Sequence, residues 1–448
     1  MSTWNLQSNA FPTPPAPMLV SDWNANLQHV DPLRGDLAEQ EAIIAGGLQS
    51  YEEIGKALRT IRDGRLYRTY CKTFEQYCLD RWGFKRQTAY DYIKAATVAE
   101  NVADVRMSVQ IDLALSQAVE LALLKPAQQR EVVDAIFAEG RNLVGLSIFK
   151  LRNVVYDVKR GRAASDAVRH FISEADDQYP PLKEKGDTTS RRGDLWVLGD
   201  HRLFVGDATD PFAITELMRE ERADMVFTDP PYRAKYTGKT EDRLTIIGDD
   251  IPMEEYKDLL AKAFRSYASV VKPTASLYLF HASAVQREFQ DALEAAKFEI
   301  RTQLIWKKNQ PVLSRSRFNF RHEPFFYCHV VGRTDEWFGD PSEDTVWEFD
   351  KPTASRDHPT MKPVELIQHA LTLSSKAGNI VVDLFGGSGS TLIACELERR
   401  RARLMEIDPQ YADVIVQRWQ ELTGKAAVLE NDGRSFDEIA RLRSRMAA

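Results

Sequence analysis

The stretch Asn379-Ile-Val-Val-Asp-Leu-Phe-Gly-Gly-Ser-Gly-Ser-Thr391 decides the fold of this 448-residue chain. Its apolar, β-branched start predicts a buried strand that ends at Asp383, and the glycines that follow predict a tight turn. Glycine lets the backbone come close to a ligand, and the first turn of a helix offers free N–H groups. The stretch therefore predicts a strand, a turn and a helix start arranged around a bound ligand.

Around this stretch, from about Gly193 onward, short β-like runs alternate with helical stretches. The runs read LWVLG, HRLFVG, ADMVFT, ASLYLF and RARLMEI, and crossover helices are expected at 254–271 and 284–297. Alternation of this kind predicts an α/β fold with a mostly parallel sheet.

The spacing between the glycine-rich turn and the next acidic residue indicates the kind of ligand. Glu406 ends the next apolar run, twenty residues after Gly386, where an acid can bind ribose hydroxyls. A dinucleotide site is not indicated, because the pattern G-x-G-x-x-G counted from Gly387 would end at Leu392. A P-loop is not indicated either, because no Lys precedes Ser390-Thr391. We therefore expect a nucleoside cofactor without a pyrophosphate.

The segment Thr228-Asp-Pro-Pro-Tyr232 follows the apolar run ADMVF. Ligand sites in open α/β sheets lie beyond the carboxyl ends of strands, so its position is suitable for a site. Because Pro has no N–H, Asp229 and the Pro230 carbonyl would form an acceptor-only rim beside the ring of Tyr232. Such a rim suits an exocyclic amino group on a planar ring. The alternative is a simple turn that ends the strand.

Two further segments carry charged groups at suitable places. His358-Pro-Thr-Met-Lys-Pro-Val364 leads into a predicted helix, and Lys362 just before that helix could hold a carboxylate. Val205-Gly-Asp-Ala-Thr209 places an acid at a strand end, about twenty residues before Asp229.

Together the four segments resemble the motifs of the amino-group (N-4/N-6) DNA methyltransferases, which use S-adenosylmethionine (SAM). The resemblance covers about residues 193–436, and its catalytic motif precedes its SAM loop by 156 residues (385 − 229). That order resembles the β class of these enzymes. It implies a Rossmann-like methyltransferase fold, double-stranded DNA as partner, and direct in-line methyl transfer to a flipped base.

The resemblance also implies roles for single residues. Asp229 and the Pro230 carbonyl would accept hydrogen bonds from the target amino group, with Pro231 beside them and Tyr232 stacked on the base. Glu406 would bind the ribose of SAM, Asp207 would lie near its adenine, and Thr360 and Lys362 near its methionine end. The implied cofactor-binding residues are Asp207, Ala208, Thr228, Thr360, Lys362, Asp383, Phe385, Gly386, Gly387, Gly389, Thr391, Glu406 and Asp408.

An Asp at the first position of the catalytic motif goes more often with N6-adenine in this family, and a Ser with N4-cytosine. We therefore expect an adenine-specific enzyme of a restriction-modification type. An N4-cytosine enzyme stays open, as do an RNA or protein-amide methyltransferase and a catalytically silent DNA-binding regulator. A homodimer and a cognate restriction nuclease are also left open.

The rest of the chain predicts a second domain. Residues 1–35 read as a Pro-rich tail, 36–173 as a helical domain, 174–193 as a linker, 194–436 as the methyltransferase domain and 437–448 as a tail. Within the helical domain, residues 74–98 read as helix, Gly-containing turn and helix, the layout of a helix-turn-helix. Lys85 and Arg86 open its second helix and could reach DNA. An ordinary helical hairpin is the alternative.

A basic stretch, Arg301–Arg321, has six Lys or Arg and no acid. It predicts a DNA-facing loop between two strands, with Lys307, Lys308, Arg315 and Arg317 as contacts. The alternative is a solvated loop whose aromatic residues belong to the core.

Composition sets the outer limits. The net charge is −7 and the four cysteines are scattered, which argues against a general nucleic-acid coat and against a disulfide framework. No membrane-spanning run and no secretory leader are evident, so a cytoplasmic protein is expected. His322 and His329 have no second ligand pair around them, so no metal site is expected.

Overall fold

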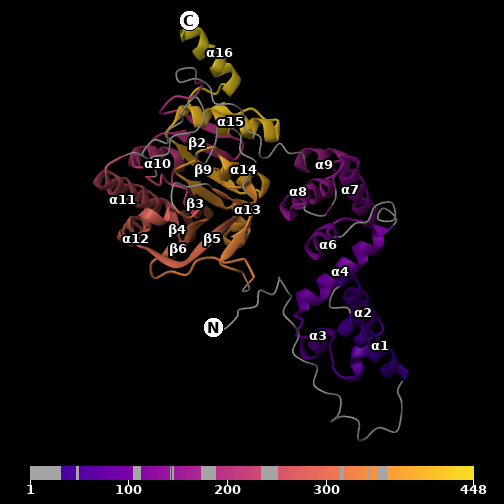
Figure 1. The fold of residues 1–448 in the computed structure, drawn as a ribbon. Helices are drawn as coiled ribbons and strands as arrows, with labels where there is room; N and C mark the ends of the chain where they lie inside the picture. Colours follow the sequence, from indigo (N-terminus) through magenta and orange to yellow (C-terminus); the bar gives the residue numbers. More distant parts are fainter. Residues whose placement is uncertain are drawn as a thin grey trace. The chain divides into compact units, whose positions relative to one another are not determined.

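A computed structural model describes residues 32–46, 50–103, 113–141, 143, 146–172, 188–233, 251–312, 317–340, 343–350 and 361–447. The chain divides into two units, Met1–Ser173 and Glu174–Ala448 (Figure 1). Residues 1–31 of the predicted tail and 174–187 of the predicted linker lie outside the described residues. No helix among the described residues is long and apolar enough to cross a membrane.

The described part of the first unit is built of helices, which confirms a helical N-terminal region. Its elements are α1 (Pro32–Gly46), α2 (Tyr51–Asp63), η2 (Leu66–Thr69), α3 (Phe74–Trp82), α4 (Arg86–Asn101), α6 (Leu115–Leu121), α7 (Pro126–Ala138), α8 (Ile148–Lys159) and α9 (Ala164–Ile172). Helix α4 contributes Ile93 to one apolar cluster and Val98 to a second. It is therefore the central helix of this unit.

The predicted helix-turn-helix falls on α3 and α4. Thr73 caps α3 by accepting a hydrogen bond from the Gln76 N–H, and Gly83 ends it with a φ of 69°. Such a left-handed residue after a helix favours Gly, which has no Cβ to clash. Gly83, Phe84 and Lys85 connect the end of α3 to Arg86 at the start of α4. The two helices are thus joined by a short turn, and DNA binding by them stays a prediction.

The second unit contains one ten-stranded sheet, with strands in the order β10-β1-β2-β9-β8-β3-β4-β6-β5-β7. The five strands β2, β9, β8, β3 and β4 run parallel, and the strands β1, β10, β6 and β5 add antiparallel edges. The strand bounds are β1 Leu195–Leu198, β2 His201–Val205, β3 Ala223–Thr228, β4 Val271–Phe280, β5 Phe298–Val312, β6 Phe320–Val330, β7 Val346–Glu348, β8 Ile380–Asp383, β9 Arg401–Glu406 and β10 Val428–Leu429. The predicted α/β class with a mostly parallel sheet is confirmed.

Helices cover both faces of this sheet (Figure 1). The first face packs against α10 (Pro211–Met218), α11 (Met253–Val270) and α12 (Gln286–Ala295), which supply the core side chains Leu217, Phe264 and Phe289. The short helix η4 (Ser283–Val285) precedes α12. The helices α13 (Val364–Ser374), α14 (Ser390–Leu397) and α15 (Pro409–Thr423) form the other layer. The expected crossovers at 254–271 and 284–297 correspond to α11 and α12.

The predicted C-terminal tail at 437–448 is wrong, because the helix α16 spans Phe436–Ala447. Phe436 packs edge-on against Trp196, with 5.1 Å between ring centroids, and Ile439 is buried. Arg443 pairs with Asp194. The apolar residues at positions i and i+3 give this helix a buried side that the charged composition of the segment conceals.

The predicted loop at Arg301–Arg321 is also wrong for its described residues, because β5 and β6 form a long antiparallel hairpin. Leu304, Trp306 and Lys308 are buried at alternate positions of β5, which is the period of a strand. The lysine at a buried position hides this period in the sequence.

Candidate active site

The glycine-rich turn after β8 favours glycine at two positions. Gly389 has a φ of 83°, and a Cβ there would lie 2.9 Å from Ile415. Gly386 donates its N–H to the Met405 carbonyl at 2.8 Å, and a Cβ there would lie 3.1 Å from that oxygen. The turn therefore folds tightly against β9 before α14 begins at Ser390.

Asp383, at the end of β8, ties this turn to its neighbours. Its carboxylate accepts hydrogen bonds from the hydroxyls of Thr228 (2.8 Å) and Thr391 (2.7 Å) and from the Phe385 N–H (3.1 Å). Burial raises the pKa of Asp383 to about 7. Tyr267 donates to the Thr228 hydroxyl at 2.7 Å, so Asp383 belongs to a buried network of neutral donors.

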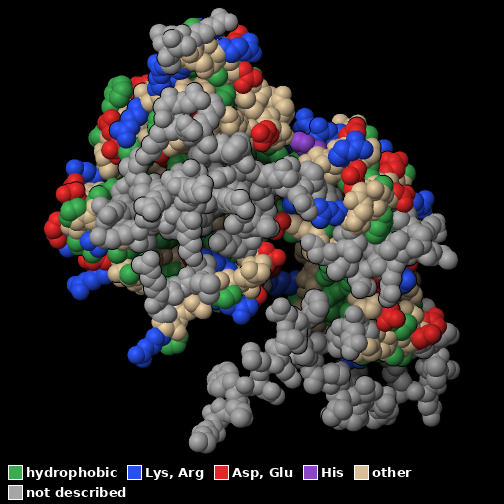
Figure 2. All heavy atoms as spheres, turned by 45° about the horizontal axis from the view of Figure 1, so that its top comes forward, with side chains coloured by type: hydrophobic (Ala, Val, Ile, Leu, Met, Phe, Trp, Pro, Cys, Tyr) green, Lys and Arg blue, Asp and Glu red, His purple; other side chains and the backbone are tan. Residues whose placement is uncertain are grey.

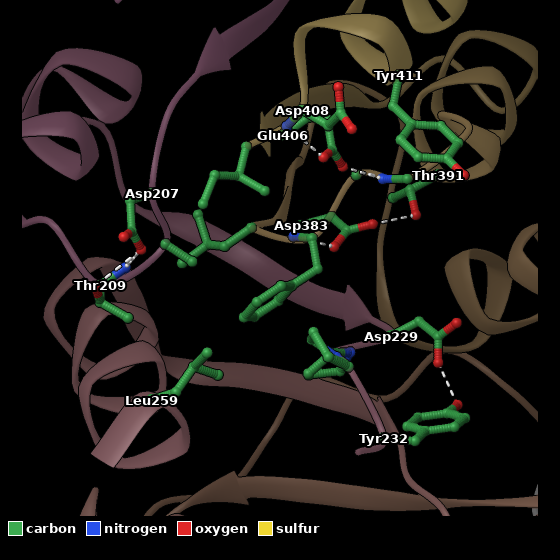
Figure 3. A pocket seen from close by; sticks show the side chains of 18 of the residues that line it. Asp207, Thr209, Asp229, Tyr232, Leu259, Asp383, Thr391, Glu406, Asp408 and Tyr411 are labelled. Atoms are coloured by element: carbon green, nitrogen blue, oxygen red, sulfur yellow. Dashed lines mark hydrogen bonds between the residues drawn. The ribbon is translucent and has the colours of Figure 1, made fainter. Parts of the chain in front are cut away.

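Glu406, at the end of β9, is held by backbone groups. Its oxygens accept hydrogen bonds from the N–H groups of Gly387 (2.7 Å) and Asp408 (2.9 Å). Burial raises the pKa of Glu406 to about 7. Asp408 itself caps α15 by accepting from the Gln410 N–H, so the two acids stand side by side at the strand end (Figure 3).

A cavity of about 820 Å³ brings these groups together with the segment after β3 (Figure 3). Its lining residues include Asp207, Ala208, Thr209, Asp229, Pro230, Pro231, Tyr232, Leu259, Lys362, Asp383, Phe385, Gly386, Gly387, Ser390, Thr391, Glu406, Asp408 and Tyr411. Asp207 accepts hydrogen bonds from the backbone and hydroxyl of Thr209, both at 2.8 Å. All four segments singled out from the sequence thus contribute to this cavity. The segment 358–364 does so through Met361 and Lys362.

Two of the predicted cofactor residues do not line the cavity, and a third lies outside the described residues. Thr228 does not line the cavity, because its fully buried hydroxyl faces Asp383. Gly389 is absent from the lining too and acts through the shape of the turn. Thr360 lies outside the described residues.

The segment after β3 carries the most polar corner of the cavity. Asp229 accepts a hydrogen bond from the Tyr232 hydroxyl at one oxygen and from the Lys362 ammonium at the other. Tyr256 donates to the Pro231 carbonyl at 2.8 Å. Burial raises the pKa of Asp229, and the charge of Lys362 opposes this shift. Lys362 bonds to Asp229 and lines the cavity, and its predicted place at the methionine end of the cofactor stays a prediction.

Two residues behind this corner were missed or misplaced by sequence reasoning. Glu323 of β6 lies 3.2 Å from the Lys362 ammonium and also accepts from Lys308 of β5. Lys308 is 5% exposed, so its predicted role as a DNA contact is wrong. Only the two-residue period of β5 could have indicated that its side chain points inward.

The other predicted DNA contacts are distributed as follows. Lys307 pairs with Glu348 at 2.6 Å, Arg317 is exposed, and Arg315 lies outside the described residues. In the first unit, Lys85 and Arg86 are exposed. No group of three or more His, Cys, Asp or Glu among the described residues could hold a metal ion.

Comparison with known proteins finds similarity within the second unit. The family model described as DNA methylase matches residues 223–417. This segment contains the motif at Thr228–Tyr232, the turn at Asp383–Thr391 and Glu406. The resemblance predicted from the sequence is confirmed at the level of the family.

Several curated proteins are similar over the same part of the chain. The type II methyltransferase M.HinfI of Haemophilus influenzae is 23% identical over 45% of this chain and 64% of its own length. M2.DpnII of Streptococcus pneumoniae is 23% identical over 47% and 87%. The DNA adenine methyltransferase YhdJ of Escherichia coli is 24% identical over 46% and 80%.

Solved structures give weaker similarities. The M1.HpyAVI–SAM complex matches with a TM-score of 0.39 and 22% identity, over 48% of this chain and 97% of the other. The cytosine-N4-specific PvuII DNA methyltransferase matches with a TM-score of 0.41 and 14% identity, over 60% and 96%.

The methyl donor of this family is SAM, and Ser390 tests whether the cavity fits it. The Ser390 hydroxyl is buried, lines the cavity and has no hydrogen-bond partner among the described residues. It stands at the first turn of α14, where N–H groups lack intrahelical partners. A buried hydroxyl and free N–H groups fit an anion such as the carboxylate of SAM. With its sheet and this cavity, the segment 223–417 of the chain matches the N-4/N-6 DNA methylase family.

Proposed function

We propose that this chain transfers a methyl group from SAM to the N6 amino group of adenine in double-stranded DNA. One observation carries the proposal: a single cavity joins the glycine turn after β8 to Asp229 after β3. A donor held at the turn and an amino group held at Asp229 would meet inside it. Holding two reactants in the right geometry supplies a large part of the rate gain in such transfers.

The cofactor end is assigned to residues around the turn. SAM, when bound, supplies a methyl group that the positive charge on its sulfur activates. The Ser390 hydroxyl and the first turn of α14 would hold its carboxylate. Glu406 retains lone pairs for ribose hydroxyls beyond its two backbone bonds, and Asp207 stands on the far side of the cavity from Asp229 (Figure 3).

The acceptor end is assigned to Asp229, Pro230 and Tyr232. The amino nitrogen of adenine is a poor nucleophile, because its lone pair is delocalised into the ring. An ionised Asp229 accepts a hydrogen bond from this group and favours a pyramidal nitrogen whose lone pair is available. Tyr232 keeps its ring fixed through its bond to Asp229, and such a ring stacks on a base that has left the duplex.

DNA contact is assigned first to the hairpin of β5 and β6. At its outer end Phe318 is 82% exposed and Phe320 is 52% exposed, with Arg317 and Arg321 beside them. Exposed aromatic rings among arginines are typical of surfaces that touch bases and phosphates. On the face in Figure 2, Lys and Arg side chains alternate with Asp and Glu. We therefore expect local DNA contacts rather than a general basic coat.

A second contact is assigned to the first unit. Lys85 and Arg86 stand at the exposed start of α4, where Arg86 lies 5.8 Å from the ring centroid of Tyr90. Helices that read DNA place their first residues toward the groove. Deleting residues 1–173 is then expected to weaken DNA binding and to flatten its salt dependence.

The choice of adenine rests on Asp229 as the first residue of its motif and on the similarity to the adenine enzyme YhdJ. N4-cytosine is the second candidate, because its exocyclic amino group suits the same acceptors. A homodimer and a partner nuclease belong to this proposal as open partners, since several relatives are type II methyltransferases.

The test is transfer of labelled methyl from SAM to unmethylated double-stranded DNA, followed by digestion to nucleosides. We expect N6-methyladenine from the wild-type chain and no product from Asp229→Ala. N4-methylcytosine would overturn the choice of base. No label on DNA, with label on RNA or on ribosomal protein, would overturn DNA as the substrate.

A further inference from the structure

Behind Asp229, four charged side chains form a line of alternating sign. Lys308 of β5 bonds to Glu323 of β6, Glu323 lies 3.2 Å from Lys362, and Lys362 bonds to Asp229. Two positive and two negative charges make the line neutral. Lys308 and Glu323 stand in the half of the β5–β6 hairpin nearer its turn, and Lys362 and Asp229 line the cavity.

The line holds the ammonium of Lys362 in one place. Lys362 is 6% exposed and Lys308 is 5% exposed. The Lys362 ammonium also lies 4.7 Å from the ring centroid of Phe280 and 5.6 Å from that of Tyr232. A buried charge is stable only when its partners satisfy it, so each member of the line depends on the next.

Glu323 and Asp229 compete for the same ammonium. Burial raises the pKa of Lys362's partner Asp229, Lys362 lowers it, and the charge of Glu323 raises it again. Burial by itself also raises the pKa of Glu323, but Lys362 and Lys308 bring it below the usual range. Lys308 thus satisfies Glu323 and leaves Lys362 available to Asp229.

We propose that Glu323 and Lys308 are positioning residues of the methyl-transfer site: Glu323 holds the Lys362 ammonium in place beside Asp229, and Lys308 pairs with Glu323 so that Lys362 stays available to Asp229 as an ionised acceptor. This inference rests on the proposed function. It assigns a task to a strand pair that carries no motif of the family resemblance. Neither residue touches the reacting atoms, so both act only through Lys362.

Other titratable groups also face Asp229, and the test must separate them. They are Tyr232 after β3, which bonds to Asp229, and Asp383 at the end of β8, whose pKa the charge of Asp229 raises; Tyr256 of α11 bonds to the nearby Pro231 carbonyl. None of these groups forms an ion pair with Lys362 among the described residues. Changes at Glu323 and Lys308 therefore address the line alone.

The experiment measures the single-turnover rate of methyl transfer against pH, with saturating SAM and DNA, for Glu323→Gln and Lys308→Met. Glu323→Gln removes the competing charge, so the acid limb, the low-pH fall of the rate as Asp229 is protonated, is expected to move to lower pH. Lys308→Met lets Glu323 compete harder for Lys362, so the limb is expected to move to higher pH. Plateau rates are expected to fall by up to about a hundredfold, because a shift of about 1 Å at a reacting centre can cost that much.

Two matched variants serve as controls. Glu299→Gln removes an exposed carboxylate of β5, and Lys272→Met removes an ammonium that bonds to Asp224 at the other end of β3. Both are expected to leave the acid limb unchanged. The double variant Lys308→Met/Glu323→Gln removes both outer charges and is expected to recover thermal stability relative to Lys308→Met.

The outcomes distinguish this inference from the proposed function. If the wild-type chain methylates DNA but both variants keep the wild-type acid limb, the pair is only structural and the inference is wrong. If the wild-type chain itself transfers no methyl group, the proposed function fails. Where Lys308→Met does not fold, the displacement in Glu323→Gln alone decides.

Discussion

Asp383 and Asp229 line one cavity and end neighbouring parallel strands, yet they are held in opposite ways. Asp383 accepts from two hydroxyls and a backbone N–H, and burial raises its pKa to about 7. Asp229 accepts from a tyrosine hydroxyl and from the ammonium of Lys362. Burial raises the pKa of both carboxyls, but only at Asp229 does a cation, Lys362, oppose that shift and favour the ionised acceptor. The partners, and not the residue type, decide the task.

The largest expected effect is at Asp229. Asp229→Ala removes the acceptor for the target amino group and is expected to lower single-turnover methyl transfer by about 10²–10³-fold or more. Binding of SAM, measured by calorimetry, is expected to stay within a few-fold of wild type. A loss of SAM binding as large as the loss of rate would place Asp229 in the cofactor site instead.

The second largest effect is expected at Lys362, because its ammonium lies between the carboxylates of Asp229 and Glu323. Lys362→Met leaves Asp229 and Glu323 buried without their shared cation. The acid limb of the rate profile is expected to move to higher pH, and unfolding free energy to fall by about 3 kcal/mol at most, since Asp229 is partly exposed. Chemical denaturation and a pH series check both. An unmoved limb would mean that Lys362 does not set the ionisation of Asp229.

The raised pKa values of Asp383 and Glu406 predict a pH effect of intermediate size. Each folded pKa lies near 7, above the usual value of about 4, so the folded chain binds more protons than the unfolded chain between these limits. Each group therefore lowers stability as pH rises from about 4 to about 7, by roughly 1 kcal/mol per pH unit.

Glu406→Gln is expected to remove its share of that slope. The measurement is the difference in unfolding free energy between this variant and wild type at several pH values, without SAM. The comparison with Asp229→Asn sharpens the contrast, because Lys362 opposes the pKa shift there. A difference that stays constant with pH would show that Glu406 titrates normally.

The smallest expected effect lies at the hairpin. Arg317→Ala is expected to weaken DNA binding by less than about tenfold and to reduce the slope of log K against log salt by about 1. Leu442→Ala, at an exposed position of α16, is the control and is expected to leave that slope unchanged. An unchanged slope in Arg317→Ala would remove this arginine from the DNA contact.

The cofactor half of the cavity could be predicted from the sequence, and the acceptor half only in part. The turn at Gly386–Gly389 depends on contiguous residues whose backbone needs are visible in the chain. The cation that bonds to Asp229 is Lys362, about 130 residues away, and Lys308, which pairs with Glu323 behind it, is about 80 residues away. Such meetings depend on sheet register and not on local pattern, which is why Lys308 was assigned to DNA.

The same contrast holds for the fold. The strands β3, β8 and β9 read directly as buried apolar runs, because parallel strands covered on both faces need them. The β5 strand was missed because Lys308 interrupts its apolar alternation, and α16 was missed because its buried side rests mainly on Phe436 and Ile439. Charged residues that are satisfied by distant partners cannot be told from solvated ones by composition.

The most direct test sets Asp229→Asn beside Asp383→Asn. Both variants keep the shape of the side chain and remove one charge, and single-turnover methyl transfer to adenine is measured with SAM and DNA at saturation. We expect Asp229→Asn to lose about 10²-fold or more, and Asp383→Asn to stay within about tenfold of wild type once SAM is saturating. Equal losses in the two variants, or a fully active Asp229→Asn, would contradict the assignment of Asp229 as the acceptor.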